Sequence, residues 1–180
     1  MELGKKLFKF ELPGTDGELY GNHNFADWSA LLIIITCNHC PYANAYWGRI
    51  AKLTERYEED NLAIVCVNPN DEERYPDDSF ENMKKFMKQT KHKFFYLRDE
   101  DQKMAKKLHA TRTPEAFLFN SKRELVYRGA IDDSWENANA VTRVYLEDAI
   151  EASLDGLEVD FPEIPPVGCS IKWKPGNEPS

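Results

Sequence analysis

Two cysteines, Cys37 and Cys40, stand in C-x-x-C spacing and are the residues of this chain best suited to chemistry. Two thiols at this spacing can close to a disulfide and open again, so the pair predicts thiol–disulfide exchange. The reactive form of a cysteine is the thiolate, which a helix N-terminus stabilises. We expect Cys37 to be the nucleophile, exposed at a strand-to-helix turn, and Cys40 to be the resolving thiol that expels a bound partner.

His39 lies between the two cysteines. A protonated imidazole beside a thiolate would stabilise the reduced state, and a more stable reduced state makes the pair more oxidising. We therefore expect His39 to take part in catalysis with the two thiols.

The segments around the pair show which elements position it. Residues 30–36 and 62–67 are continuous apolar runs, as in central strands that are covered on both faces. A helical stripe begins at Pro41, so a crossover helix joins the two strands and makes them parallel. The cysteine pair falls at the carboxyl end of the first strand, where open α/β sheets bind their ligands.

The rest of the chain alternates between strand and helix patterns, which predicts an α/β fold with a mixed central sheet and helices on both faces. We expect an N-terminal hairpin over residues 7–20, and Asp78 with Glu81 should form the capping box of a helix. Five of the ten prolines lie between Pro162 and Pro179. This composition predicts one domain over residues 1–160 and an extended, Pro-rich tail over 161–180 rather than more sheet. The other expected elements are a strand at 94–97, a helix at 102–109, a hairpin over 116–127 and a last helix near 141–157.

Several motifs occur in an order that resembles the thioredoxin fold, and in particular the peroxiredoxin-like redoxins, relatives of alkyl hydroperoxide reductase and of the cytochrome-maturation thioredoxins. The resemblance covers nearly the whole chain. The motifs are T-C-N-H-C-P-Y (36–42), V-N-P-N-D (67–71), T-P-E-A-F-L-F (113–119), Y-R-G-A-I-D-D (127–133) and G-C-S-I-K-W-K-P-G (168–176).

This resemblance implies a thioredoxin-like three-layer fold in which Pro114 is cis and packs beside the cysteines. It also implies that Thr113 and Pro114 bind the backbone of a substrate. The expected function is a thiol–disulfide oxidoreductase that reduces disulfides or sulfenic acids and is recharged by a dithiol reductase. No organic cofactor is implied, because none of the nine glycines forms a dinucleotide or phosphate-binding loop.

Two other functions stay open. Peroxiredoxins reduce peroxides and carry a threonine three residues before the reactive cysteine, whereas Cys37 stands three before Cys40 and Ile34 three before Cys37. A copper- or zinc-binding module would use the same thiolates, since soft ligands favour these metals. Zinc, however, takes four ligands, and the sequence has no second C-x-x-C, so we predict no metal site.

Two cysteines lie outside the pair. Cys66 falls within an expected strand, where a free cysteine is a core residue. Cys169 lies in the tail, for which two interpretations stay open. The tail docks on its own domain or on another subunit, or it folds over the site so that Cys169 acts as a third redox thiol with Cys37 or Cys40.

The composition excludes several classes of partner. Twenty-three basic and 31 acidic residues give a net charge of −8, which argues against binding to nucleic acid or to an anionic membrane. The longest apolar runs are far shorter than the roughly 20 residues of a membrane span. The N-terminus lacks the apolar stretch of a secretory signal, so we expect a cytoplasmic protein with protein-disulfide or peroxide substrates.

Overall fold

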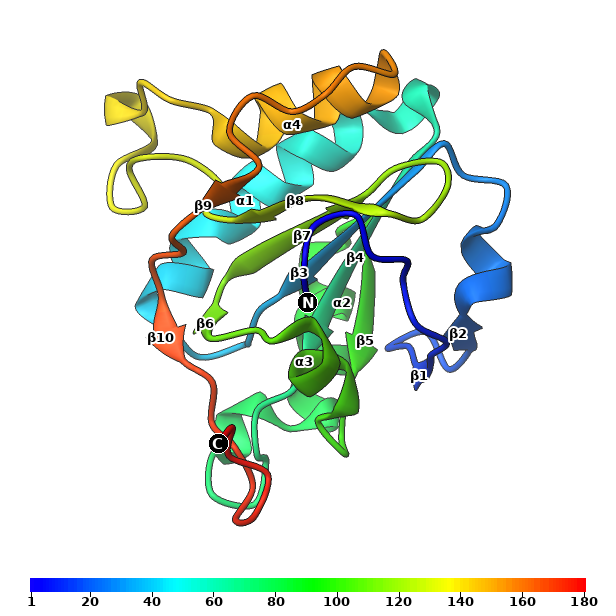
Figure 1. Cartoon of the computed structure of the whole chain (residues 1–180). Coiled ribbons are helices and arrows are strands. Elements are labelled where there is room, and N and C mark those ends of the chain that lie inside the picture. The colour runs from blue at the N-terminus through cyan, green and yellow to red at the C-terminus, as the bar shows by residue number, and fades with distance from the viewer.

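The computed structural model describes the whole chain, Met1–Ser180. A six-stranded mixed sheet forms its centre, in the order β5-β4-β3-β7-β8-β9 (Figure 1). Strands β3, β4 and β5 are parallel, β7 is antiparallel to both β3 and β8, and β9 is parallel to β8. The predicted mixed sheet is confirmed. The strands are β3 (Ala30–Ile35), β4 (Leu62–Asn68), β5 (Phe95–Arg98), β7 (Glu115–Phe119), β8 (Leu125–Gly129) and β9 (Glu163–Ile164).

Apart from Asn68 at the end of β4, the two central strands are apolar, because helices or loops cover both of their faces. Every residue of β3 and β4 is buried. Successive side chains of a strand point to opposite faces. Leu32 and Ile34 therefore pack in one core with α1 (Pro41–Arg56), α2 (Phe80–Thr90) and α4 (Tyr145–Leu154). Leu31 and Ile33 pack in a second core with α3 (Lys103–Leu108), so helices cover both faces as predicted.

Short elements complete the fold. The predicted N-terminal hairpin is present as β1 (Glu11–Pro13) and β2 (Leu19–Gly21), which form a sheet of their own. The hairpin is shorter than expected, because the apolar residues before Glu11 pack against the second core instead of pairing. Four 3-10 helices are η1 (Asn22–Phe25), η2 (Glu58–Asp60), η3 (Pro76–Asp78) and η4 (Ala138–Ala140).

The start of α2 differs from the predicted capping box. Its N-cap is Ser79, whose Oγ accepts a hydrogen bond from the backbone N–H of Asn82 at 3.1 Å. Asp78 ends η3 and is 2% exposed, so its carboxylate serves contacts other than this helix. The expectation that Asp78 caps α2 is therefore wrong.

The C-terminal segment contains short strands, which corrects the prediction that the tail adds nothing to a sheet. β9 joins the edge of the central sheet beside β8, and a Cβ at Gly129 would clash with the carbonyl oxygen of Ile164. β10 (Cys169–Ser170) pairs antiparallel with β6 (Arg112–Thr113). Ile171 is 4% exposed and belongs to the second core. The tail thus runs along the domain from its edge strand (Figure 1), and its contacts with the domain extend to Asn177, which bonds to Gln102.

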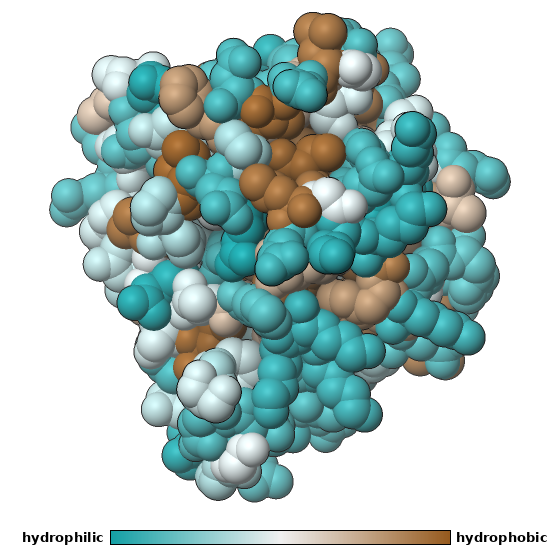
Figure 2. All heavy atoms as spheres, viewed as in Figure 1, coloured by the Kyte–Doolittle hydropathy of each residue, from teal (hydrophilic) through white to brown (hydrophobic).

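The surface is mainly hydrophilic. Figure 2 shows polar side chains over most of one face and apolar side chains gathered in its upper half. No helix combines the length and the apolar character that a membrane crossing requires.

Candidate functional site

The cysteine pair lies where β3 passes into α1. Cys40 is the N-cap residue of α1, with φ −162° and ψ 130°, and Pro41 is the first helical residue. A proline disfavours the helical conformation in the residue before it, so the helix cannot include Cys40. The free N–H groups and the dipole of the helix N-terminus therefore act on Cys40, not on Cys37.

Both thiols of the pair are buried. Cys37 is 0% exposed, Cys40 is 2% exposed, and the two lie 4.3 Å apart. The prediction that Cys37 is exposed at the turn is wrong, because its side chain packs against Cys40, Ala43 and Thr113 instead of facing solvent. Cys37 follows the end of β3 and contacts Thr113.

Thr113 and Pro114 lie against the pair. The peptide bond between them is cis, as the resemblance implied. The Cys37 thiol donates a hydrogen bond to Thr113 Oγ1 at 3.5 Å, and Cys40 Sγ lies 3.6 Å from the carbonyl oxygen of Thr113. One residue of the segment before β7 therefore contacts both sulfur atoms.

A third thiol completes the cluster. Cys169 Sγ lies 2.6 Å from Cys40 Sγ. Cys169 is also paired with Thr113 in the antiparallel contact between β10 and β6. The preceding residue, Gly168, lies against the backbone of Thr113. A Cβ at position 168 would clash with the carbonyl oxygen of Thr113. The tail therefore brings Cys169 to the site on a strand of fixed register.

The three thiols differ in acidity because each acts on its neighbour. The neighbouring Cys37 thiol lowers the pKa of Cys40 to about 4 against the opposing effect of burial, and the Cys169 thiol adds to this lowering. The contact of Cys37 with Cys40 and the burial of Cys37 raise the pKa of the Cys37 thiol well above the ordinary range. Burial and the contact with Cys40 raise the pKa of Cys169 to about 11. These opposite directions make Cys40 the most acidic of the three thiols.

The His39 side chain is exposed to solvent and lies beside Asp77. Its side chain is 74% exposed, and Nδ1 lies 3.7 Å from a carboxylate oxygen of Asp77. The catalytic role that we expected of His39 stays a prediction, and its imidazole pairs with an exposed carboxylate instead of with a thiol.

A buried carboxylate holds the backbone between the two cysteines. Asp78 Oδ1 accepts hydrogen bonds from the backbone N–H groups of Asn38 at 2.7 Å and of His39 at 3.3 Å. The side-chain amides of Asn68 and Asn70 donate to the same carboxylate at 3.3 and 3.0 Å. Charge-assisted bonds of this kind are stronger than neutral ones, so Asp78 fixes the conformation of the C-x-x-C loop.

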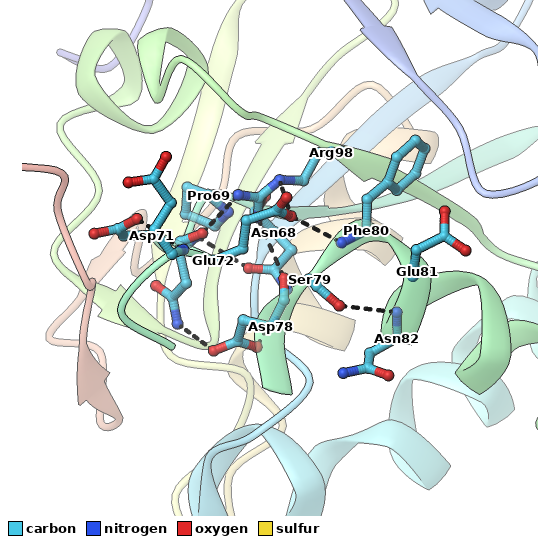
Figure 3. A network of polar contacts seen from close by, with 12 residues as sticks. Asn68, Pro69, Asp71, Glu72, Asp78, Ser79, Phe80, Glu81, Asn82 and Arg98 are labelled. Carbon is cyan, nitrogen blue, oxygen red and sulfur yellow. Dashed lines mark hydrogen bonds and ion pairs between the residues drawn. The ribbon is translucent and has the colours of Figure 1, made fainter. Parts of the chain in front are cut away.

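A buried arginine holds the backbone around that carboxylate. Arg98, at the end of β5, is 2% exposed and donates to the carbonyl oxygens of Asn68, Asn70 and Asp78. Figure 3 shows Arg98, Asn68 and Asp78 converging from β5, β4 and η3. Arg98 also forms an ion pair with Glu72, in which Nε of Arg98 lies 3.6 Å from Oε2 of Glu72. Sequence reasoning missed this network, because its members come from segments that are distant along the chain.

The same network fastens the tail. The backbone N–H of Lys172 donates to Asn70 Oδ1 at 2.9 Å, and the carbonyl of Lys172 accepts from the backbone of Asp71 at 2.8 Å. Gln102 Nε2 donates to the Lys172 carbonyl at 3.0 Å, and Gln102 Oε1 accepts from the N–H of Lys174. The C-x-x-C loop and the tail are thus held by one connected set of side chains.

No group of three or more His, Cys, Asp or Glu side chains is arranged to hold a metal ion. A cavity of about 250 Å³ lies beside Pro114, and none of the three thiols lines it. Among its lining residues are Tyr46, Trp135 and Val167.

Solved structures share this architecture. A hypothetical protein, SMc02350 from Sinorhizobium meliloti 1021, is 35% identical, with a TM-score of 0.92 over 98% of this chain and 97% of its own. An uncharacterised conserved protein from Geobacillus kaustophilus is 37% identical, with a TM-score of 0.91 over 97% and 94%. The exposed lipoprotein thioredoxin Etrx1 of Streptococcus pneumoniae is 17% identical and matches with a TM-score of 0.62 over 83% and 100%. The comparison with curated proteins gave no match.

The mixed sheet, the C-x-x-C pair at the start of α1 and the cis proline beside it define a protein of the thioredoxin fold, as the resemblance implied. Residues 2–144 match the Redoxin family, and the chain belongs to that family. Family and fold together support a thiol-based redox function.

Proposed function

We propose that the protein is a thiol–disulfide oxidoreductase that works through Cys37 and Cys40. The observation that carries this proposal is the contact of Thr113, next to the cis proline, with both sulfur atoms of a C-x-x-C pair. Disulfide exchange requires two neighbouring thiols, one of them ionised. The thiolate attacks the substrate disulfide, and the second thiol resolves the mixed disulfide that forms.

Cys40 is the attacking thiolate in this proposal, and Cys37 resolves. The thiolate is the nucleophile of exchange, and Cys40 has both the lowered pKa and the position at the helix N-terminus. These roles are the reverse of those that the sequence led us to expect.

The reaction transfers two electrons. Cys40 attacks one sulfur of a substrate disulfide, and the other substrate sulfur leaves as a thiolate. Cys37 then loses its proton and attacks Cys40, so that the second substrate thiol leaves and a Cys37–Cys40 disulfide remains. An external dithiol reductase must return two electrons to the pair in each cycle.

The substrate class in this proposal is a disulfide or a sulfenic acid. In a cytoplasm with a reducing glutathione poise, the recharged pair would act mainly as a reductant. The cytoplasmic location and the partner reductase belong to the proposal.

A second candidate is a thiol-dependent peroxidase. The observation that favours it is a thiolate at the N-cap of α1 with a second thiol, Cys169, in contact with it. Cys40 would attack a peroxide and become a sulfenic acid while the peroxide leaves as an alcohol or water. A neighbouring thiol would then form a disulfide with Cys40 and release water.

The two functions are separated by supplying one dithiol reductant, dithiothreitol, and two oxidants in parallel assays. We expect catalysed reduction of oxidised glutathione that is lost in Cys40→Ser and strongly slowed in Cys37→Ser. Cys66→Ala is the matched control, because Cys66 is buried in β4 away from the site, and this variant should keep the wild-type rate. A rate enhancement with hydrogen peroxide alone would establish the peroxidase instead. Equal rates in wild type and Cys40→Ser with both oxidants would overturn both functions.

A further inference from the structure

The tail occupies the position next to the cis proline that an added substrate strand would take. An extended peptide can bind an exposed strand edge by adding a strand to it. At Thr113 this edge already carries β10, with Cys169 opposite Thr113. The chain therefore places its own cysteine where the sulfur of a bound substrate is expected.

This part of the tail is held on both sides of Cys169. Before it, β9 pairs with β8 and Gly168 allows the backbone to approach Thr113. After it, Ile171 is buried in the second core and the backbone of Lys172 bonds to Asn70 and Gln102. A thiol fixed in contact with a reacting atom gains the large advantage of an intramolecular reaction over an external thiol.

We propose that Cys169 is a third redox thiol that forms a disulfide with Cys40 during turnover. The inference rests on the proposed function, since Cys40 must first react with an oxidant. It deepens that function, because the first thiol to resolve the mixed disulfide on Cys40 is then Cys169 and not Cys37.

Resolution by Cys169 is a second thiol–disulfide exchange at Cys40. Cys40 thiolate attacks a disulfide RS–SR′, forms a mixed disulfide with RS, and releases R′S⁻. Cys169 gives up its proton and attacks Cys40 Sγ, the bond to RS breaks, and RS⁻ leaves and takes up that proton. The two cysteine sulfurs have lost two electrons, and the substrate disulfide has gained them. Cys37 then gives up its proton and attacks Cys40, which moves the disulfide to Cys37–Cys40, and Cys169 leaves and takes up that proton.

Proteolysis with trypsin distinguishes the two disulfides. Cys37 and Cys40 lie in one peptide, residues 10–49, whereas Cys169 lies in residues 144–172. A Cys37–Cys40 disulfide makes the first peptide lighter by two hydrogen atoms, and a Cys40–Cys169 disulfide links the two peptides.

The experiment oxidises the full-length reduced chain with one equivalent of oxidised glutathione, quenches samples with acid over time, alkylates free thiols and maps the peptides. We expect the linked peptide as the earliest product in wild type and as the final product in Cys37→Ser. It should be absent in Cys169→Ser and unchanged in Cys66→Ala.

Two other results decide against the proposal. If glutathione is released but wild type forms only the Cys37–Cys40 disulfide, and Cys37→Ser accumulates glutathione on Cys40, the role of Cys169 is overturned while the proposed function stands. If neither glutathione release nor any disulfide is observed, the inference and the proposed function are overturned together.

Discussion

Cys169 faces Thr113 across an antiparallel strand pair, and Thr113 is the residue that contacts both thiols of the C-x-x-C pair. The tail and the C-x-x-C loop therefore meet at Thr113. Both cysteines of the pair are buried, and we expect the position of β10 to control which molecules reach Cys40.

A side chain at position 168 should displace the tail from the site. A Cβ there would clash with the backbone of Thr113, and overpacking of this kind costs about 1–3 kcal/mol. We expect Gly168→Ala to expose Cys40, so that iodoacetamide modifies it faster than in wild type, and to lower the yield of the Cys40–Cys169 disulfide.

Gly48→Ala is the control for that substitution. Gly48 lies in α1, and a Cβ added there meets no atom. This variant should be more stable than wild type by roughly 0.5–1 kcal/mol, because alanine favours the helix, and its Cys40 should react at the wild-type rate. Equal protection of Cys40 in wild type and Gly168→Ala would show that the tail does not cover the site.

The acidity of Cys40 should depend on Cys37. Because the Cys37 thiol is the largest cause of the lowered pKa, we expect Cys37→Ala to raise the midpoint of the Cys40 thiolate titration above its wild-type value of about 4. Cys37→Ser keeps a donor and should raise it less. The ultraviolet absorbance of the thiolate, followed against pH, measures both midpoints, and an unchanged midpoint in Cys37→Ala would refute the coupling.

The lowered pKa of Cys40 should make the reduced protein more stable as the pH rises. Between pH 4 and about 8.5 the folded state holds Cys40 as a thiolate while the unfolded state holds a proton on it, so the unfolded state binds more protons. The contribution of Cys40 to stability therefore rises with pH in this window and is lost as the pH falls towards 4. In urea titrations at several pH values, the difference in unfolding free energy between wild type and Cys40→Ser should grow from pH 5 to pH 8. A constant difference would contradict the assignment.

Removing the charge of Asp78 should loosen the C-x-x-C loop. In Asp78→Asn an amide group must face N–H donors from Asn38, His39 and two side-chain amides. Leaving a buried donor unsatisfied costs about 1–3 kcal/mol, which urea unfolding would detect.

Asp77→Asn is the matched control for Asp78→Asn, because the neighbouring Asp77 side chain is 71% exposed. Its unfolding free energy should stay within about 0.5 kcal/mol of wild type, as for most surface substitutions. Similar losses in the two variants would mean that Asp78 has no special role at the site.

His39 should affect the redox potential only weakly. Its side chain is 74% exposed, pairs with Asp77 and is screened by solvent. We expect His39→Ala to shift the potential of the pair by less than about 30 mV, the equivalent of about 1.4 kcal/mol for two electrons. A larger shift towards a more reducing potential, measured in glutathione buffers, would restore the electrostatic role that the sequence suggested.

The elements that carry the site could be predicted because their patterns are local. The apolar runs of β3 and β4 and the stripe of α1 each lie within one segment, and the parallel pairing of β3 with β4 followed from the crossover helix. The expected exposure of Cys37 at the turn was wrong, although the predicted helix start at Pro41 held the signal that places Cys40 nearer the helix N-terminus. Pro41 excludes Cys40 from the helix and thereby makes it the N-cap.

The contacts made by Asp78 and Cys169 could not be predicted in the same way. Asp78 stands before a helix, where a capping role is the local expectation, yet its partners lie 39 and 40 residues away in the chain. Cys169 meets Cys40 across 129 residues. Such pairings depend on the packing of the whole fold, and no local pattern encodes them.

A redox titration tests the central claim most directly. The full-length chain is equilibrated in buffers of reduced and oxidised glutathione, quenched, and alkylated so that mass spectrometry counts its free thiols. We predict a two-electron transition that is present in wild type and in Cys66→Ala and absent in Cys40→Ser. If no transition appears across the range of glutathione ratios, or if it persists in Cys40→Ser, Cys40 is not the redox centre of this protein.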